Sequence, residues 1–341
     1  MSILFATSHL KYLCSKYRLT PSKRYGQNFL LREEPIEKML AAAEISKKDT
    51  VVEIGPGFGA LTFALAERAG KVIAYEIEKK LQPYWEEQVK KHKNVEIAWG
   101  NVLKNRELGM GNKEYKVVAN LPYQITSNVL RKFLSRGERD PAVAGEADSP
   151  SVMVLMVQKE VAERICAGPG DMSLLAVSVQ YYAEPEIIMK VPKTFFWPEP
   201  KVDSAVIKLS LRGMEQHRWL HSSTVAAGDR DYGAVMSAGT LAPQPPLGDY
   251  GASDDSDDDN EQWFFKVVKA GFAQKRKLLI KNLQPLLDSP VLSRGNDNEG
   301  AKEKLEKIFT EMGIGPNIRA QELSVEQWKQ LSTLLRDNFV V

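Results

Sequence analysis

The stretch TVVEIGPGFG, residues 50–59, decides the fold of this chain. Its first half is a short apolar run, which predicts a buried strand. Three glycines at alternate positions follow directly, and glycine allows a tight turn in which backbone N–H groups approach a ligand closely. The spacing differs from the GxGxxG of dinucleotide-binding proteins, and no Lys-Ser/Thr follows the turn. The turn therefore favours neither a nicotinamide cofactor nor a nucleoside triphosphate.

Strand-like and helix-like segments alternate around this stretch. We expect further strands at Lys71–Tyr75, Val95–Trp99, Tyr115–Ala119, Val152–Val157 and Ser204–Leu211. Helical spacing is found at Pro35–Ile45, Ala60–Ala69, Leu81–Lys91 and Ile125–Leu134. The alternation predicts an α/β fold with a parallel, doubly wound sheet. Ligands of such sheets bind beyond the carboxyl ends of the strands, where the glycine turn, Glu76, Asn101 and Asn120 all fall.

The length of 341 residues and the apolar content of 43% suffice for two domains. The segments Trp263–Phe272, Lys275–Leu287, Ala301–Met312 and Ser324–Asp337 have helical spacing and predict a small all-α domain at residues 262–341. Residues 213–261 are rich in Gly, Ala, Ser, Pro and Asp without an apolar period, which predicts a disordered, acidic insertion. Because no apolar run reaches the length of a membrane span, we expect a soluble protein without a membrane partner.

The charges are nearly balanced in number but not in position. The chain carries 46 basic and 44 acidic residues, and five of the six residues from Asp254 to Asp259 are Asp. The segments Lys11–Arg32 and Lys266–Lys281 are strongly basic. This distribution suits a polyanionic partner.

Cysteine and histidine usage excludes several classes of site. Cys14 and Cys166 lie far apart without CxxC spacing, so we expect neither a disulfide framework nor a zinc site, and a reducing compartment. The four histidines show no metal-ligand spacing, and we expect no metal.

Residues 1–25 form a basic amino-terminal arm, and the first acidic residue of the chain is Glu33. An organellar transit peptide shows the same pattern. Against that interpretation, Leu10, Leu13 and Tyr17 lie at helical spacing, and residues 19–21 run directly into the segment that carries the GQNFL motif (residues 26–30). We favour a folded arm and a cytoplasmic protein, and organellar targeting stays open.

The tetrapeptide Asn120-Leu121-Pro122-Tyr123 follows a predicted strand and has the chemistry of a base-binding shelf. The Asn120 side-chain oxygen and the Leu121 carbonyl can both accept hydrogen bonds from one exocyclic amino group. Pro122 fixes φ and holds these acceptors, while Tyr123 offers a flat face for stacking. These groups suit the amino group of a flipped-out adenine or cytosine. Alone, Asn-x-Pro also makes ordinary turns.

Taken together, these motifs resemble a class I S-adenosylmethionine-dependent methyltransferase. More closely, the chain is similar to the ribosomal RNA adenine N6,N6-dimethyltransferase family, of the small-subunit, kasugamycin-resistance type. The resemblance rests on GQNFL (residues 26–30), EIGPGFG (53–59), NLPY (120–123) and FWPEPKVDS (196–204). It implies a Rossmann-like catalytic domain at residues 26–212, with the helical residues 262–341 binding RNA.

The resemblance also implies residue roles. It assigns S-adenosyl-L-methionine to Asn28, Leu30, Gly55, Gly57, Glu76, Asn101 and Asn120. Glu76 would hold the ribose, and Asn101 stands where the family usually has Asp against the adenine amino group. Asn120 would face both the cofactor and the target base, and Tyr123 and Phe196 would sandwich or support that base. Together with Leu121 and Pro122, these residues form the predicted catalytic set.

Basic residues near aromatic ones suggest the RNA surface. An aromatic cluster at residues 195–197 lies beside Lys193 and Lys201, and we expect exposed rings there that stack on bases. Lys275, Arg276 and Lys277 form a dense cluster without acids between them, which favours contact with the RNA backbone over a merely solvated helix face.

The sequence therefore predicts a monomeric enzyme that dimethylates adenines in small-subunit ribosomal RNA, with the immature small subunit as its partner. Two alternatives stay open. One is a large-subunit adenine methyltransferase of the macrolide-resistance type, although the AQKRK (273–277) and ELSVE (322–326) segments resemble the small-subunit branch. The other is a non-catalytic RNA- or DNA-binding assembly factor on the same fold.

Overall fold

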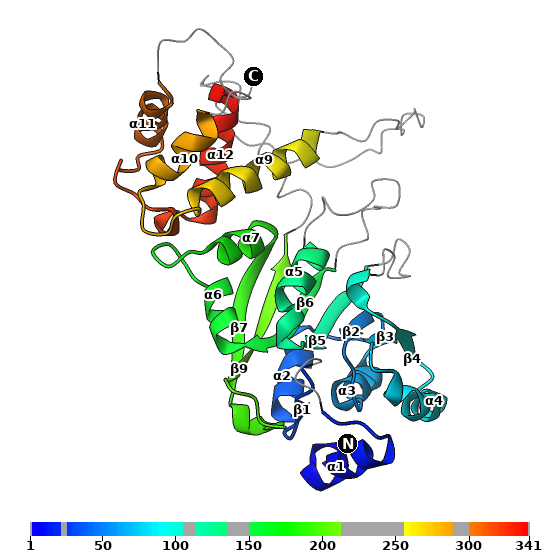
Figure 1. The fold of residues 1–341 in the computed structure, drawn as a ribbon. Coiled ribbons are helices and arrows are strands. Elements are labelled where there is room, and N and C mark those ends of the chain that lie inside the picture. Colours follow the sequence, from blue (N-terminus) through cyan, green and yellow to red (C-terminus); the bar gives the residue numbers. More distant parts are fainter. Residues whose placement is uncertain are drawn as a thin grey trace, which may run out of the picture.

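A computed structural model describes residues 2–21, 26–104, 114–134, 150–212, 256–288 and 300–339. Figure 1 shows a sheet layered with helices, and a separate group of helices formed by the carboxyl-terminal residues. The two ends of the chain lie at opposite ends of the molecule. Of the predicted disordered insertion, residues 213–255 lie outside the described residues.

The sheet has seven strands in the order β4-β3-β2-β5-β6-β9-β7 across the described residues. The strands are β2 (Thr50–Ile54), β3 (Lys71–Glu76), β4 (Val95–Trp99), β5 (Lys116–Asn120), β6 (Val152–Gln158), β7 (Ala183–Val191) and β9 (Ser204–Leu211). β2 to β6 are parallel, whereas β9 pairs antiparallel with both β6 and β7. The prediction of an α/β fold is confirmed, but the sheet is mixed instead of wholly parallel. The sequence analysis did not predict β7, because this strand lies half-exposed at the edge of the sheet and lacks a continuous apolar run. β9 lies between β6 and β7 and runs antiparallel to both.

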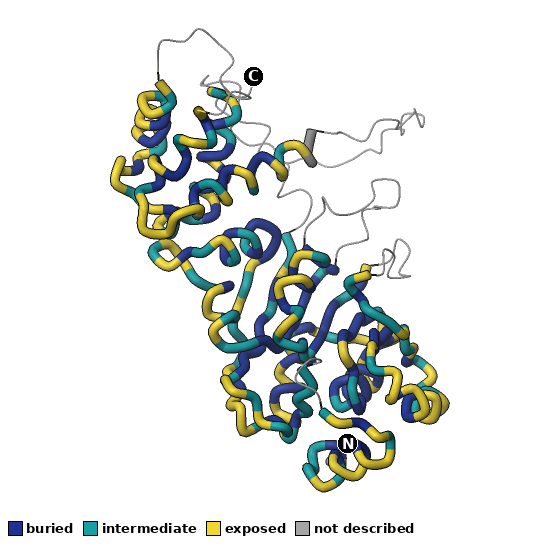
Figure 2. Tube along the Cα trace, in the orientation of Figure 1, coloured by how far each residue is buried: buried dark blue, intermediate teal, exposed yellow. Residues whose placement is uncertain are grey.

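Helices cover both faces of the sheet. Successive residues of β2 point to opposite faces of the sheet, since Val51 packs into one core cluster and Val52 into another. The first face carries α2 (Glu34–Ala42), α3 (Ala60–Arg68) and α4 (Gln82–Lys91), and the second carries α5 (Thr126–Leu134), α6 (Lys159–Ile165) and α7 (Leu174–Tyr182). Figure 2 shows the inner strands of the sheet mostly buried and the outer sides of the helices exposed. The carboxyl ends of β2 to β5 are thereby held in a fixed arrangement.

The amino-terminal arm is folded in its described part. It forms a short 3-10 turn (Ser2–Phe5) and the helix α1 (Thr7–Lys16), whose residues Leu10, Leu13 and Cys14 are buried. A separate two-stranded sheet then joins β1 (Phe29–Leu30) to β8 (Phe196–Trp197). The helical spacing expected for the arm is therefore confirmed.

The carboxyl-terminal helices are α9 (Ser256–Gly271), α10 (Leu279–Leu287), α11 (Ala301–Glu311) and α12 (Val325–Phe339). They share one core cluster with α7, where the rings of Tyr181 and Phe264 stack with centroids 4.3 Å apart. α9 begins at Ser256, so residues 256–261 are helical and do not belong to the predicted insertion. The helix predicted from Lys275 begins only at Leu279, because a turn at residues 272–277 precedes it.

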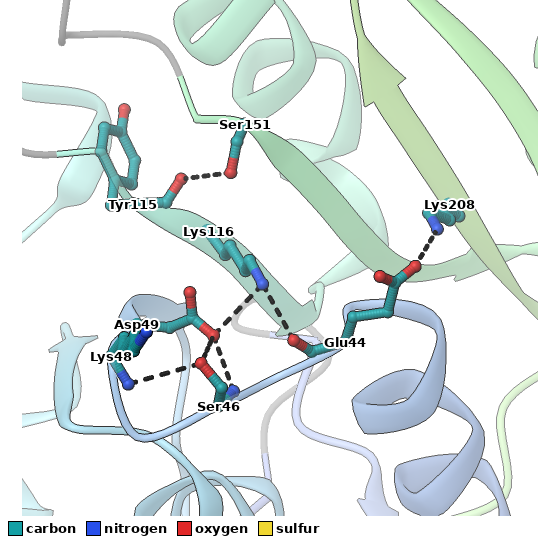
Figure 3. Close-up of polar contacts among 8 residues, drawn as sticks. All are labelled: Glu44, Ser46, Lys48, Asp49, Tyr115, Lys116, Ser151 and Lys208. Atoms are coloured by element: carbon teal, nitrogen blue, oxygen red, sulfur yellow. Dashed lines mark hydrogen bonds and ion pairs between the residues drawn. The ribbon is translucent and has the colours of Figure 1, made fainter.

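A polar cluster lies at the amino-terminal ends of β2 and β5, at the end of the sheet away from the carboxyl ends of these strands (Figure 3). The Lys116 ammonium donates to the Asp49 carboxylate at 3.2 Å and to the Glu44 carbonyl at 3.0 Å. The same Asp49 oxygen accepts hydrogen bonds from the Ser46 N–H at 2.6 Å and the Ser46 hydroxyl at 2.9 Å. Partial burial alone would raise the pKa of Asp49, but the hydrogen bonds from Ser46 and Lys116 outweigh it and lower that pKa. The cluster ties β5 to the loop that leads into β2.

We expect Asp49→Ala to lower the free energy of unfolding by about 1–3 kcal/mol at pH 7, because Lys116 loses its partner where its side chain is only 17% exposed. The folded-state pKa of Asp49 is depressed, so its contribution is complete above the unfolded-state pKa and disappears as pH falls through the folded-state value. Urea unfolding of both proteins at several pH values measures this. The difference should shrink below about pH 4.

The matched control is Glu87→Ala, which breaks the Glu87–Lys91 ion pair. These side chains are 54% and 62% exposed, so the loss should stay below about 0.5 kcal/mol. Equal losses for the two variants would contradict the importance of the Asp49 cluster.

Candidate active site

A cavity opens to solvent at the carboxyl ends of β2, β3 and β5. It is lined by Leu4, Leu10, Gly26, Gln27, Asn28, Phe29, Leu30, Glu53, Gly55, Pro56, Gly57, Phe58, Ala60, Leu61, Glu76, Ile77, Asn120 and Pro122. Segments that are far apart in the sequence thus meet at the sheet edge where the sequence predicted ligand binding.

The glycine turn after β2 forms one wall of this cavity. Gly55 and Gly57 both have positive φ, +75° and +55°, which side chains other than glycine rarely adopt. A Cβ on Gly57 would also lie 3.3 Å from the Phe29 ring. Side chains of α4 hold the turn from behind, since the Trp85 indole donates to the Gly57 carbonyl at 3.1 Å and the Tyr84 hydroxyl to the Phe58 carbonyl at 2.8 Å. The turn is therefore rigid and exposes backbone to the cavity.

Glu76 lies at the end of β3, directly across from this turn. Its carboxylate accepts hydrogen bonds from the Gly57 N–H at 3.1 Å and the Glu78 N–H at 2.7 Å. The residue is only 5% exposed. Burial raises the pKa of Glu76, and the backbone hydrogen bonds oppose that rise. A carboxylate oxygen can accept more than one hydrogen bond, so Glu76 keeps acceptor capacity for two neighbouring ligand hydroxyls.

Glu53 is a second buried carboxyl group in the wall of the cavity. It is 1% exposed, and its Oε2 atom has no hydrogen-bond partner among the described residues. Burial raises the pKa of Glu53 to about 8, and the negative charge of Glu76 adds to the rise. The nearby Thr62 hydroxyl opposes the rise. An unpartnered carboxyl oxygen beside an open cavity fits a cationic ligand.

The shelf predicted at the end of β5 has the expected position. Asn120 and Pro122 line the cavity, while Leu121 is 2% exposed and donates its N–H to the Met156 carbonyl at 3.1 Å. The Tyr123 hydroxyl lies 2.7 Å from the hydroxyl of Ser204, which is fully buried at the start of β9. Burial raises the pKa of Tyr123, and the hydrogen bond to Ser204 opposes that rise. This hydrogen bond anchors the hydroxyl end of Tyr123, which does not itself line the cavity within the described residues.

The pairing of β1 with β8 brings Asn28 and Leu30 to the cavity, and Leu30 pairs with Phe196. Phe196 is only 3% exposed and packs into the core cluster of the first face. The prediction of an exposed ring is therefore wrong for Phe196, because its strand turns this side chain inward. The neighbouring Trp197 is half-buried and stacks on Phe29 with ring centroids 6.3 Å apart. A supporting role of Phe196 beneath the base stays a prediction.

Asn101 follows β4 and is half-buried. Its side-chain oxygen accepts a hydrogen bond from the Leu103 N–H at 3.0 Å and so shapes the turn that follows the strand. Asn101 does not line the cavity within the described residues. Its predicted contact with the adenine amino group stays a prediction.

The basic residues predicted to bind RNA are all exposed. Lys201 follows β8, whereas Lys275, Arg276 and Lys277 lie in the turn between α9 and α10 and not on a helix face. Five cavity residues lie outside the site motifs of the sequence analysis, namely Leu4, Leu10, Ala60, Leu61 and Ile77. Ile77 carries a local signal, since it is an apolar residue that directly follows Glu76 at the end of a strand, and it is 47% exposed in the structure. Leu4 and Leu10 carry none, because their place depends on how α1 packs.

The fold and the cavity define a class I S-adenosylmethionine-dependent methyltransferase. The observations that fit this cofactor are the turn at Gly55 and Gly57, the acceptor capacity of Glu76 and the unpartnered Glu53 oxygen. Residues 19–222, more than half of the chain, match the sequence model of the family described as ribosomal RNA adenine dimethylase. The chain belongs to this family.

Relatives and solved structures agree with this membership. The chain is 36% identical over 343 residues to a protein of Bacillus cytotoxicus named "Ribosomal RNA small subunit methyltransferase A", covering 98% of each. It is 35% identical to a protein of the same name from Dehalococcoides mccartyi, covering 96% of this chain and 93% of the relative.

Two solved structures share the fold. One is a dimethyladenosine transferase from Plasmodium falciparum, with a TM-score of 0.65, 21% identity and coverage of 90% of this chain and 97% of the other. The other is the 23S rRNA methyltransferase ErmE, with a TM-score of 0.60, 24% identity and coverage of 90% and 99%. At these identities the likeness concerns the fold alone.

We expect Glu76→Gln to weaken S-adenosylmethionine binding by about 10- to 100-fold, since a charged acceptor is replaced by a neutral amide that must also satisfy the Gly57 N–H. Isothermal titration calorimetry measures this. The control is Glu96→Gln on β4, an exposed carboxylate paired with Lys71, which should leave the affinity unchanged. Equal affinities of wild type and Glu76→Gln would contradict the role given to Glu76.

Glu53 should make cofactor binding depend on pH. Its carboxyl is mostly protonated at neutral pH, and a cationic ligand favours the ionised form, so binding is accompanied by proton release. The affinity of wild type for S-adenosylmethionine should therefore rise by up to about tenfold per pH unit below pH 8. Glu53→Gln removes this contribution. Calorimetry from pH 6.5 to 9 measures the affinity of both proteins, and titration of the ligand itself cancels in the difference between them. Parallel curves of affinity against pH for wild type and Glu53→Gln would refute the prediction.

Proposed function

We propose that this chain transfers methyl groups from S-adenosylmethionine to the N6 atom of adenine in small-subunit ribosomal RNA, forming N6,N6-dimethyladenine. The observation that carries the proposal is the cavity that joins Glu76 and the glycine turn to Asn120 and Pro122 of the shelf. A cofactor site and an acceptor site for an amino group therefore share one space. Membership in the ribosomal RNA adenine dimethylase family gives the reaction class.

The residues of the shelf act on the target base. S-adenosylmethionine, when bound, supplies an activated methyl group on a sulfonium. The N6 lone pair of adenine is delocalised into the purine ring and is a poor nucleophile. Hydrogen bonds from its N–H groups to the Asn120 side-chain oxygen and the Leu121 carbonyl favour a more tetrahedral nitrogen and aim its lone pair. The rate enhancement then comes from position and electrostatics, and the proton leaves to water.

Tyr123 holds the plane of the base in this proposal. Its hydroxyl is anchored by the 2.7 Å hydrogen bond to the hydroxyl of Ser204. A fixed ring loses little entropy when a base stacks on it. Dimethylation needs the monomethylated amine to return to the same position, and a rigid stacking face serves that need.

The relatives in Bacillus cytotoxicus and Dehalococcoides mccartyi support small-subunit RNA as the substrate, since both are named small-subunit methyltransferases and match nearly the whole chain. ErmE, named for 23S RNA, shares the fold at lower identity. The alternative of a large-subunit enzyme therefore has less support. The open cavity with its unpartnered Glu53 oxygen argues against a purely binding protein, which has no need for it.

The immature small ribosomal subunit is the proposed partner, with the enzyme acting as a monomer in the cytoplasm. The described residues contain no helix whose length and apolar character would suit a membrane span. The exposed cations Lys201, Lys275, Arg276 and Lys277 support contact with the RNA backbone around the target.

We expect Asn120→Ala to lower the rate of methyl transfer by about 100-fold or more while particle binding stays unchanged, because one of two acceptors for the amino group is lost. Transfer of tritiated methyl groups to undermethylated small subunits measures the rate, and filter binding measures the affinity. Asn128→Ala, an exposed asparagine on α5, is the matched control and should behave as wild type. Unchanged transfer by Asn120→Ala would refute the assigned role.

Mass spectrometry of ribosomal RNA from cells lacking the protein tests the substrate itself. Loss of dimethyladenine from the small-subunit RNA supports the proposal. Loss from the large-subunit RNA instead would select the alternative, and an unchanged pattern would leave only the non-catalytic one.

A further inference from the structure

Helix α1 has a buried face that belongs to the catalytic domain. Leu10, Leu13 and Cys14 are between 2% and 6% exposed and pack into the core cluster of the first sheet face. The Tyr17 ring meets the Tyr84 ring of α4 edge to face, with centroids 5.6 Å apart. The helix is therefore docked and not a loose extension.

The same buried face reaches the cavity. Leu10 of α1 and Leu4 of the preceding 3-10 turn line the space that Glu76 and Asn120 also line. An α-helix is about 10 Å in diameter, so whatever touches the outer side of α1 is within a few nucleotides of the cavity. α1 is thus part of the wall around the proposed reaction site.

The opposite side of the helix, called here the α1 outer face, consists of Ser8, Lys11, Tyr12, Ser15 and Lys16. All five are exposed, and Tyr12 is 58% exposed. Neither lysine forms an ion pair with a described residue. Lys16 lies over the Tyr17 ring at 5.1 Å, and Tyr17 acts on it most strongly. Glu87, the acid whose charge also acts on Lys16, is engaged with Lys91.

We propose that the α1 outer face binds the RNA substrate beside the cavity, an inference that rests on the proposed function. The two lysines present their charges to phosphates, and the Ser8 and Ser15 hydroxyls add hydrogen-bond donors. Tyr12 offers an exposed ring on which an unpaired base stacks. His9 extends this ring surface, with its centroid 6.1 Å from that of Tyr12.

RNA suits this face better than a lipid surface does. A helix that lies in a membrane interface presents a broad apolar face to the lipid. The apolar residues of α1 are already buried against the catalytic domain, and the α1 outer face holds charge, hydroxyls and one aromatic ring. Its position beside the cavity also matches a substrate that must extend past the reacting base.

The test is the triple variant Lys11→Ala, Tyr12→Ala and Lys16→Ala in the full chain, assayed with undermethylated small ribosomal subunits. We expect RNA affinity to fall by about 10- to 100-fold, from the loss of stacking and two phosphate contacts. The slope of log affinity against log salt should decrease by about 1.4 for two lost contacts to single-stranded RNA. S-adenosylmethionine affinity should stay within twofold of wild type, because none of the three residues lines the described cavity.

The matched control is Lys90→Ala with Lys93→Ala, which removes two exposed charges around the end of α4. It should change RNA affinity by less than twofold. A second variant, Lys11→Glu with Lys16→Glu, should weaken RNA binding more than the triple variant does. Circular dichroism and the temperature of unfolding confirm that each variant is folded.

Unchanged RNA affinity and salt slope in both α1 variants would overturn the inference. So would equal weakening by the Lys90 and Lys93 control, since the effect would then be general charge. Binding of vesicles containing anionic phospholipid that the triple variant loses, with RNA affinity intact, would assign the face to a membrane and also overturn it. If wild type fails to methylate the particles, the proposed function fails, whatever the binding data show.

Discussion

The site depends on one hydrogen bond, from the Gly57 N–H to the Glu76 carboxylate. It joins the turn after β2 to the end of β3, and parallel pairing of these two strands brings the partners together. A buried carboxylate without such donors would be costly. The acceptor in turn adds to the hydrogen bonds from Tyr84 and Trp85 that hold the glycine turn. The two motifs therefore stabilise each other, and neither forms a cofactor site alone.

Around this bond the cavity is assembled from elements that are distant in sequence. The β1–β8 pair brings Asn28 and Leu30 from one side, and β5 brings Asn120 from the other. α1 adds Leu4 and Leu10. Each element is fixed by burial elsewhere, since α1 and β8 both pack into the core cluster of the first sheet face. The rigidity of the reaction site is thus a consequence of packing in the whole domain.

The carboxyl-terminal helices are continuous with the catalytic domain through the second core cluster. Stacking of Tyr181 on Phe264 joins α7 to α9, and the Tyr182 hydroxyl donates to the Glu261 carboxylate. Arg212 at the end of β9 and Lys329 on α12 both pair with Glu326, at 3.3 Å each. An aromatic core with polar contacts around it holds the exposed turn at Lys275–Lys277 in a defined position relative to the sheet.

The sequence by itself determined the alternating elements, the glycine turn, Glu76 and the Asn120–Tyr123 shelf. These are local patterns, in which strand period, positive-φ glycine and proline geometry act within a few residues. Only the tertiary structure decided that Phe196 is buried and that the basic residues from Lys275 form a turn. It also decided that β9 pairs antiparallel with both β6 and β7, and that Leu4 and Leu10 line the cavity. These features depend on which surfaces meet, and contacts between residues far apart in the chain leave no local pattern in it.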